Sequence, residues 1–214
     1  MDKISYTAYT HSMTKTEKTV TQDNILAALK SHLASGEKLS HLDFNVLAAS
    51  LECETSEIYA HYNDENALFK GLMAQLDQRC ADELTHHIMN ENPKDRLFEA
   101  FMARFDILNE DRKSWENLFY EVLKTPPLLK TAMPQFHDSM DVMLRLCDLN
   151  GRDGASVQTF KVGAIAIVYL NTVRVWLNDQ TSDMAQTMAE LDRSLTRLDS
   201  VIAGLPSPLR ALIS

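Results

Sequence analysis

Apolar side chains recur at the spacing of amphipathic α-helices along almost the whole of this chain. Between residues 24 and 34 they fall on one stripe, close to the 3.6-residue period of a helix, and later segments repeat this pattern. We find no convincing strand. The pattern predicts an all-α fold of about nine helices, which cover residues 24–34, 44–51, 56–62, 65–89, a segment beginning at 93, 112–124, 129–149, 156–178 and 183–203.

Residues that start and stop helices divide the chain in the same places. Gly36 follows the first helix as a C-terminal stop, and Asp43 is placed to cap the N-terminus of the second. Pro93 begins a later helix in its first turn, where a missing N–H costs nothing. The pair Pro126-Pro127 ends the helix before it, and we expect Pro134 to kink the helix that contains it.

Helix length separates two parts of the chain. The first three helices are short and the later ones are longer, so we expect a small N-terminal module joined to a larger helical domain. The predicted divisions are a disordered arm (1–20), a helix-turn-helix module (21–64), a larger domain (65–204) and a tail (205–214). The arm is rich in Thr, Ser and Lys and has no periodicity, and prolines interrupt the tail.

Composition limits the partners and the compartment. The 214 residues hold 21 Lys and Arg against 30 Asp and Glu, a formal net charge of −9. This charge excludes a generally basic protein that coats nucleic acid and a polybasic membrane binder. Three widely spaced cysteines fit a reducing compartment. The N-terminus lacks an apolar signal core, and the most apolar stretch (162–177) is shorter than a membrane span. We therefore expect a cytoplasmic protein.

The most specific motif lies between Leu47 and Leu68. Two short helices separated by a tight turn have the spacing of a helix-turn-helix. The segment resembles the TetR family of transcriptional regulators, whose pattern is I-A-x-x-A-G-V-S-x-G-T-L-Y-x-H-F-x-S-K-E-x-L. The chain fits that pattern without gaps at Leu47-Ala48, Cys53, Ile58-Tyr59, His61-Tyr62 and Leu68.

This resemblance implies a homodimeric DNA-binding repressor that a hydrophobic small-molecule effector controls. The family reads operator DNA with the second motif helix, which implies DNA contacts at Thr55, Ser56, Glu57, Tyr59, His61, Tyr62 and Lys70. Its larger domain holds an apolar cavity, which implies a ligand pocket at Phe101, Phe105, Phe119, Tyr120 and Met140. Its last two helices form the dimer interface, which implies contacts at Gly163, Ala166, Leu191 and Leu195.

The acidic character of the motif supports a different interpretation. Between residues 22 and 70 there are three lysines against eight acidic residues. Glu52, Glu54 and Glu65 stand where the family has its turn glycine, its serine cap and its phosphate-facing lysine. Because Lys and Arg supply nearly all of the non-specific affinity for DNA, the module could also be inherited architecture that no longer binds DNA.

A second motif near the C-terminus runs through Trp176-Leu177, Asp179, Asp183, Thr187 and Leu191-Asp192. It resembles the closing helices of the ubiquinone-biosynthesis accessory proteins, which are lipid binders with a TetR-like fold. That resemblance implies the alternative function, a lipid-binding accessory protein without DNA binding. On physical grounds the same residues also fit a structural corner, where Ser182 or Asp183 caps the last helix and Trp176 anchors the packing.

The sequence gives no pattern typical of an enzyme or of a metal site. Glu57 and His61 are four residues apart, as are His61 and Glu65, but neither pair has a third ligand. We find no G-x-S-x-G nucleophile motif, no phosphate-binding loop and no dinucleotide fingerprint. We therefore expect no catalytic residue, no metal and no cofactor.

Overall fold

The computed structural model describes residues 20–85, 92–151 and 154–204, and the secondary structure in those ranges is helical throughout. In chain order the helices are α1 (Gln22–Ala34), the 3-10 helix η1 (Leu39–His41), α2 (Phe44–Leu51), α3 (Thr55–Tyr59), α4 (Glu65–Thr85), α5 (Pro93–Glu110), α6 (Arg112–Lys124), α7 (Pro126–Leu146), α8 (Ala155–Trp176) and α9 (Ala185–Gly204). The prediction of an all-α fold with nine α-helices is confirmed for the described part of the chain.

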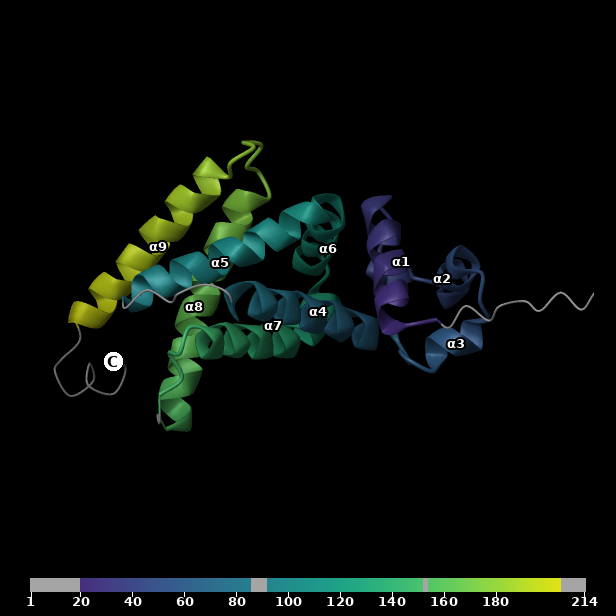
Figure 1. The fold of residues 1–214 in the computed structure, drawn as a ribbon, viewed down its shortest axis with the longest axis horizontal. Helices are drawn as coiled ribbons and strands as arrows, with labels where there is room; N and C mark the ends of the chain where they lie inside the picture. The colour runs from purple at the N-terminus through teal and green to yellow at the C-terminus, as the bar shows by residue number, and fades with distance from the viewer. Residues whose placement is uncertain (1–19, 86–91, 152–153, 205–214) are drawn as a thin grey trace, which may run out of the picture.

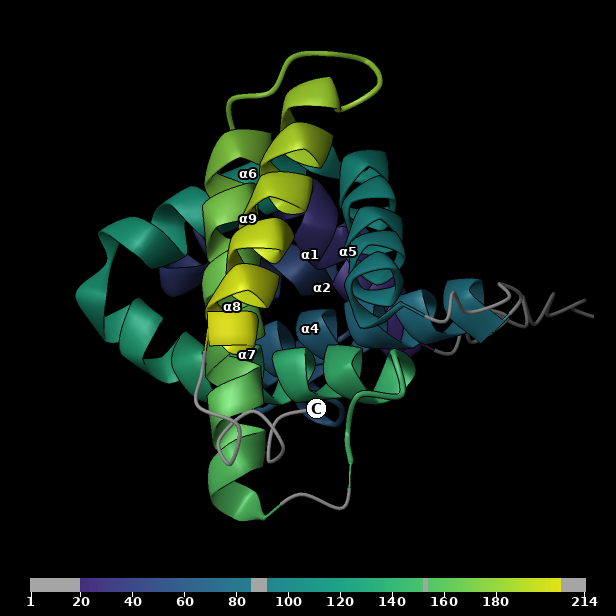
Figure 2. The same cartoon turned by 90° about the vertical axis from the view of Figure 1, so that its left-hand side faces the viewer.

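The helices form a small module and a larger body. Helices α1 to α3 lie together at one end of the molecule, and α4 leads from them into the body (Figure 1). Within the body, α4 packs against α5 and α7, and α5 also packs against α9. The most extensive packing between two helices is that of α8 against α9, which lie side by side at the end opposite α3 (Figure 2). We call α1 to α3 the module and α4 to α9 the body.

Local capping explains where several helices begin. The Asp43 carboxylate accepts a hydrogen bond of 2.9 Å from the N–H of Asn45, so the predicted cap of α2 is confirmed. Pro93 opens α5 as predicted, behind an Asn92 side chain that accepts from the N–H of Lys94 at 3.0 Å. In both places a side-chain oxygen satisfies an N–H that the first turn of a helix leaves unpaired.

Several details of the helices differ from the sequence prediction. Helix α7 begins at Pro126 and not at residue 129, because proline suits the first turn of a helix. The pair Pro126-Pro127 therefore ends α6 and also starts α7. The sequence pattern did not predict η1, which has only three residues. Helix α3 ends at Tyr59 and α7 ends at Leu146, each three residues before the predicted end. The other predicted boundaries that lie in the described ranges agree within about two residues, the usual uncertainty of helix ends.

Some predicted segments lie outside the described residues. These are nearly all of the arm (1–20), the tail (205–214) and the end of the helix predicted over 65–89. No helix in the ranges that the structure describes is long and apolar enough to cross a membrane.

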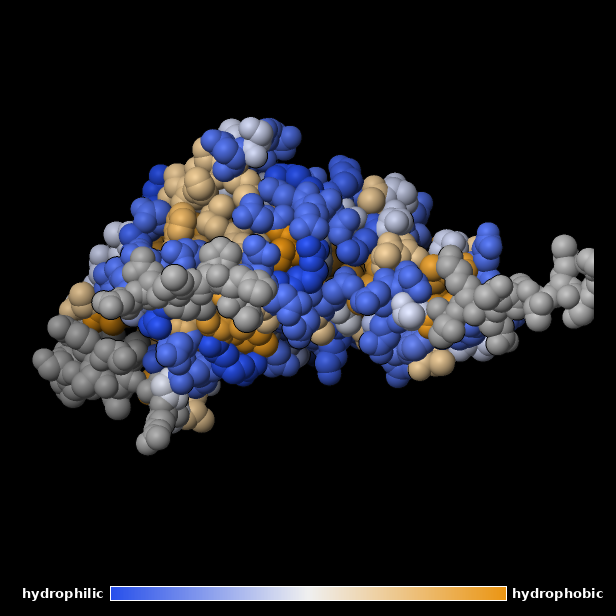
Figure 3. All heavy atoms as spheres, viewed as in Figure 1, coloured by the Kyte–Doolittle hydropathy of each residue, from blue (hydrophilic) through white to orange (hydrophobic). Residues whose placement is uncertain are grey.

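Aromatic rings form the centre of the body. The Tyr169 ring of α8 stacks on Phe101 and Phe105 of α5, with ring centroids 5.4 and 5.5 Å apart. Trp176 is fully buried beside them. On the surface, hydrophobic atoms emerge in patches between hydrophilic ones over both the body and the module (Figure 3). The densely packed core makes the body a rigid scaffold.

Candidate functional site

Helix α3 is the second helix of the motif, and its N-terminus is closed by groups of the chain itself. The carboxylate of Glu57 accepts a hydrogen bond of 3.0 Å from the backbone N–H of Glu54. The hydroxyl of Thr55 donates to the side-chain oxygen of Asn45 on α2, at 2.7 Å. Helix N-termini favour anions such as phosphate, and here acidic side chains already stand at that end.

The turn between α2 and α3 passes through the left-handed backbone region. Glu52 ends α2 with φ 55° and ψ 41°, and the next N–H, that of Cys53, donates to the carbonyl of Ala48 at 3.1 Å. The TetR pattern has glycine at the position of Glu52, where this conformation has no steric cost. The chain thus keeps the backbone of the turn with a side chain that costs about 1 kcal/mol there.

The outward surface of the motif presents the side chains of Ser56, Glu57, Tyr59 and His61. Lys70 is also exposed, on α4, whereas Thr55 is half-buried. Tyr59 is 55% exposed and stacks on Phe44 of α2, with ring centroids 4.9 Å apart. The Nε2 of His61 lies 3.1 Å from the carbonyl oxygen of Val20. This contact ties the end of the motif to the chain that enters α1.

Tyr62, which the family pattern implied as a DNA contact, is buried. Its side chain is 7% exposed, and its ring packs so closely on Gly71 that an added Cβ there would lie 2.8 Å from it. Burial raises the pKa of Tyr62, and the negative charge of Asp23 raises it further. Tyr62 therefore packs the module against α4 and does not lie on the outward surface. The sequence pattern cannot distinguish inward from outward at a helix end.

One of the lysines of the module forms an ion pair with the body. The ammonium group of Lys30 on α1 lies 2.6 Å from the Asp111 carboxylate at the start of α6. Two other lysines, Lys38 in the module and Lys70 on α4, form no ion pair among the described residues. The surface available to an anionic partner is thus even less positive than the count of lysines indicates.

Helix α6 holds the module through hydrogen bonds to backbone groups. The side chains of Ser114 and Asn117 each donate at 2.7 Å, to the carbonyls of Lys30 and Leu33 in α1. The buried carboxylate of Glu121 accepts from the N–H groups of Leu39 and Ser40 in η1, at 2.8 and 2.9 Å. We call this set the α6 junction. The sequence analysis missed it, because its partners lie 81 to 84 residues apart.

The residues expected to line a ligand pocket are mostly core. Phe101, Phe105 and Met140 are fully buried, and Phe119 meets Trp176 edge to face at 6.2 Å. Tyr120 lies outside this cluster, 38% exposed, with the Lys124 ammonium 5.3 Å from its ring centre. The structure therefore places Phe101, Phe105 and Met140 in the core and leaves Tyr120 on the surface of α6.

A charged network crosses this core. Arg104 is fully buried and donates to the Tyr169 hydroxyl at 3.2 Å, to Asp77 at 2.5 Å and to Ser139 at 2.7 Å. Burial alone lowers the pKa of Arg104, but the surrounding groups Tyr169, Cys80 and Asp77 together raise it above its usual value. The guanidinium therefore stays charged and joins α4, α5, α7 and α8.

The expected dimer contacts divide into two kinds. Gly163 is exposed on α8, and Ala166 is half-buried. Leu191 and Leu195 of α9 are 0% and 2% exposed within the single chain, so they pack inside the body and are not on the surface. The exposed apolar side chains on α8 and α9 are instead those of Phe160, Ile167, Leu170 and Val201. These four residues and Gly163 define what we call the α8–α9 face, which belongs to the helices in front in Figure 2.

The C-terminal motif forms a structural corner between α8 and α9. The Asp179 carboxylate is fully buried and accepts four hydrogen bonds of 2.5 to 3.0 Å, from the N–H and hydroxyl groups of Thr181 and Thr187. Burial on its own raises the pKa of Asp179, but these donors outweigh it and hold the pKa well below its usual range. Arg112 covers the same corner, donating to the carbonyls of Trp176 and Asp179 at 2.6 and 2.8 Å.

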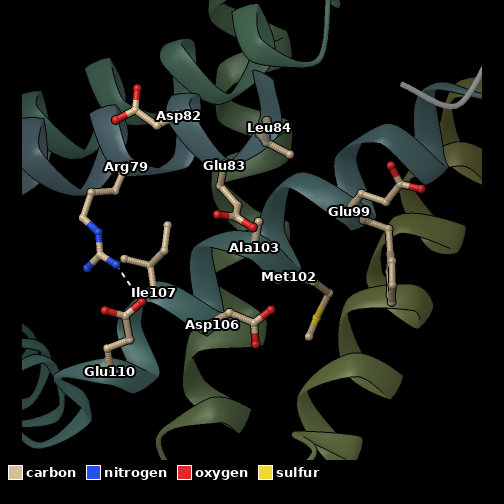
Figure 4. A pocket seen from close by; sticks show the side chains of 11 residues that line it. Arg79, Asp82, Glu83, Leu84, Glu99, Met102, Ala103, Asp106, Ile107 and Glu110 are labelled. Carbon is tan, nitrogen blue, oxygen red and sulfur yellow. Dashed lines mark hydrogen bonds and ion pairs between the residues drawn. The ribbon is translucent and has the colours of Figure 1, made fainter. Parts of the chain in front are cut away.

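A groove between α4 and α5 was not expected from the sequence. Acidic and apolar side chains from both helices line it (Figure 4). Asp82 and Glu83 are adjacent on α4, whereas Asp106 and Glu110 are four residues apart on α5, which places these two on one side of that helix. That spacing is visible in the sequence, but the pairing of the two faces is not. Among the residues that the structure describes, no group of three or more His, Cys, Asp and Glu side chains could hold a metal ion.

Comparison with known proteins identifies the fold. No protein-family model matches the chain, and no curated protein sequence matches it. A TetR transcriptional regulator from Nitrosomonas europaea has a similar structure, with a TM-score of 0.64 and 19% identity, over 84% of this chain and 98% of that one. A TetR regulator from a Rhodococcus species matches with a TM-score of 0.55 and 14% sequence identity, over 82% of this chain and 93% of that one. A TetR-family regulator from Streptomyces coelicolor matches with a TM-score of 0.55 and 12% sequence identity, over 90% of this chain and 89% of that one. The chain thus has a TetR-like fold.

Proposed function

We propose that this chain, with its TetR-like fold, is a homodimeric DNA-binding transcriptional regulator, a repressor, that a hydrophobic small-molecule effector controls. The observation that carries the proposal is the placement of α3. This helix lies at the end of the molecule far from α8 and α9 (Figure 1), and its exposed Ser56 and Tyr59 present hydrogen-bonding groups outward. A short outward helix of this kind is the element that enters the major groove in helix-turn-helix proteins.

The α8–α9 face supports dimerisation. Ile167 is 64% exposed and Val201 is 59% exposed, on the two helices that form one side of the body. Contiguous exposed apolar side chains typically mark an interface between proteins, and two-fold homodimers are the commonest oligomers. In such a dimer the two copies of α3 would be held at a fixed separation, as a palindromic operator requires.

The α6 junction supports a route from the body to the module. Helix α6 is fixed to the α8–α9 corner through Arg112 and to η1 through Glu121. A shift of α6 would therefore move the module relative to the dimer helices. A ligand controls DNA binding through such a shift if it binds more tightly to the arrangement that does not fit the operator.

The decisive experiment is selection of operator fragments from genomic DNA by the purified full chain at low salt. The substitution Glu65→Lys should strengthen binding to DNA of every sequence, because it adds a cation beside the motif. The control Glu37→Lys makes the same charge change in the hollow beside α6 and should have a smaller effect. We also expect DNA binding to depend only weakly on salt, because few lysines are available to neutralise phosphates and the slope of log K against log salt is about −0.9 for each phosphate neutralised.

The same preparation tests the dimer. Gly163→Glu should give monomers by light scattering, because a Cβ at this position meets no atom within 4 Å in the single chain, and only a partner would reject it. Leu123→Glu changes an exposed apolar residue on α6 and should leave the dimer intact. A dimer that survives Gly163→Glu would contradict the α8–α9 interface.

One observation favours the alternative, a body that binds lipid and a module that no longer binds DNA. The pairing of Lys30 with Asp111 leaves the motif surface acidic, and phosphate contacts need cations. If neither the natural chain nor Glu65→Lys binds any DNA at low salt, the regulator is excluded and this alternative stands. The C-terminal motif does not by itself favour lipid binding, since the hydrogen bonds of Asp179 account for its residues.

A further inference from the structure

A cleft between α1 and α4 lies where the module meets the body. Its volume is about 460 Å³, within the range of roughly 300 to 1,000 Å³ that ligand pockets have. Helix α1 packs more extensively against α6 than against α4, so the two walls of the cleft are joined only lightly. We call it the α1–α4 cleft. Its described lining residues are Gln22, Asp23 and Leu26 of α1, Tyr62 at the end of the motif, and Gly71, Ala74, Gln75, Gln78 and Arg79 of α4.

Tyr62 is a buried polar side chain that faces this cleft. It is 7% exposed, and its hydroxyl lies over Gly71, where an added Cβ would be 2.9 Å from the hydroxyl oxygen. The hydroxyl forms no hydrogen bond with any group that the structure describes. Burying a hydroxyl without a partner costs free energy, and most buried polar groups in proteins are therefore paired. The hydroxyl of Tyr62 thus indicates a partner from outside the described chain.

Asp23 places a negative charge beside this hydroxyl. One oxygen of its carboxylate accepts a hydrogen bond of 3.0 Å from Nε2 of Gln75, but no cation pairs with it in the described ranges. The charge of Asp23 adds to the effect of burial in raising the pKa of Tyr62, so the two groups lie within electrostatic reach. Arg79 does not neutralise Asp23, because it lies 2.6 Å from Glu110.

The glutamine side chains of α4 present oxygen atoms to the cleft. A carboxylate only accepts hydrogen bonds, so the contact with Asp23 fixes the nitrogen of Gln75 towards the acid. Its side-chain oxygen is then left without a partner among the described residues. Gln78 is held in the same way, since its Nε2 donates to Asp82 at 2.8 Å. The free groups of the cleft are therefore mainly acceptors, and they carry one unpaired negative charge.

A primary ammonium group matches this arrangement. It has three N–H donors, no acceptor and a single positive charge. Asp23, Gln75 and Tyr62 offer it a carboxylate, an amide oxygen and a hydroxyl oxygen, from three different segments of the chain. A metal ion matches less well, because no group of three or more His, Cys, Asp and Glu side chains in the described ranges could hold one.

We propose that the α1–α4 cleft binds a small molecule with one primary ammonium group, which donates to Asp23, Gln75 and Tyr62 while its apolar part lies against Leu26 and Ala74. Such a ligand would join α1 to α4 and so fix the module against the body. If it is the effector, it controls DNA binding through that link, and this part of the inference rests on the proposed function. Binding itself does not depend on DNA.

Titration of the isotope-labelled full chain with phenethylamine, followed by NMR at low ionic strength, tests the site. We expect saturable shifts of the side-chain amide signal of Gln75 and of backbone signals in α1 and α4. Phenethyl alcohol is the matched probe, because it replaces the ammonium group with a neutral hydroxyl. It should bind roughly tenfold more weakly, since hydrogen bonds between charged groups are the stronger ones.

Two variants locate the ammonium group. Asp23→Asn removes the charge but keeps an oxygen for Gln75, and should weaken the amine by roughly tenfold. Tyr62→Phe removes only the hydroxyl and should weaken it by roughly threefold. This variant should leave the urea midpoint unchanged, because the hydroxyl has no partner to lose among the described residues. Asp138→Asn is the control, since Asp138 is exposed on α7 outside the cleft, and should leave the affinity unchanged.

Four outcomes would overturn the site. They are no saturable shift, equal affinity for the amine and the alcohol, equal weakening by Asp23→Asn and Asp138→Asn, or a lower urea midpoint for Tyr62→Phe, which would give the hydroxyl a partner in the fold.

The effector role is tested separately on the selected DNA. The change in DNA affinity that phenethylamine causes is compared between the natural chain and Asp23→Asn. A change that is the same in both excludes the effector role and leaves the site. Absence of DNA binding excludes the proposed function and also leaves the site.

Discussion

The corner between α8 and α9 and the groove between α4 and α5 each hold an aspartate, in opposite surroundings. Asp179 in the corner is fully buried, and four donors lower its pKa. Asp106 in the groove is more exposed, yet burial and Glu83 raise its pKa. The degree of burial thus does not decide the direction of the shift. The number of hydrogen-bond donors that meet the carboxylate decides it.

This comparison separates two uses of negative charge in an acidic protein. A carboxylate that receives several N–H and O–H donors replaces its hydration shell with groups of the chain and becomes part of the fold. A carboxylate that faces other carboxylates keeps its need for a positive partner. Asp179 and Glu121 belong to the first kind. Asp106 belongs to the second kind.

The largest expected effect is at the corner. Asp179→Ala removes the acceptor for both Thr181 and Thr187, and it should lower the free energy of unfolding by about 3 kcal/mol, because buried donors are left unpaired. Urea unfolding measures this. Asp183→Ala is the control in the same turn. It loses only one bond, 3.2 Å from the N–H of Ala185, and should cost about 1 kcal/mol or less. Equal costs would contradict the role of Asp179.

The pH dependence gives an independent check on Asp179. The folded-state pKa of this carboxyl is lowered, so its stabilisation is fully present above the unfolded-state pKa of about 3.9. The stabilisation is lost as pH falls from there towards the folded-state pKa. The difference in unfolding free energy between the natural chain and Asp179→Ala should therefore shrink below about pH 4. A difference that stays constant down to pH 2 would exclude a charge effect.

The next effect extends the comparison to the α6 junction. Glu121→Ala leaves the N–H groups of Leu39 and Ser40 without their acceptor, and should cost about 2 kcal/mol. Amide hydrogen exchange at these two residues should also become faster. Glu37→Ala, an exposed glutamate in the adjoining hollow, should change neither. Unchanged exchange in Glu121→Ala would mean that the junction does not hold the module.

The smallest effect is in the groove and has the opposite sign. The folded-state pKa of Asp106 is raised, so ionising it destabilises the fold at every pH above its titration. Asp106→Asn should therefore raise the free energy of unfolding near pH 7, by roughly 0.3 kcal/mol, since solvent screens an exposed group. The gain should disappear below the unfolded-state pKa. A loss of stability at pH 7 would show that the carboxylate has a favourable partner.

Much of the helix pattern followed from the sequence because its causes are local. The Asp43 cap joins residues two apart, and Pro93 needs only its own ring to favour a first turn. The family pattern also located α3 correctly. It failed at Tyr62, since only the fold places Gly71 against that ring.

The sequence by itself determined the helices, their caps and the acidic character of the motif, because each depends on residues a few positions apart. The tertiary structure alone decided which charged side chains find a partner within the protein. Lys30 meets Asp111 from 81 positions away, and the groove exists only because the acidic faces of α4 and α5 lie against each other. Periodicity tells which side chains share a face. It does not tell which face meets which, because that depends on how all the helices pack together.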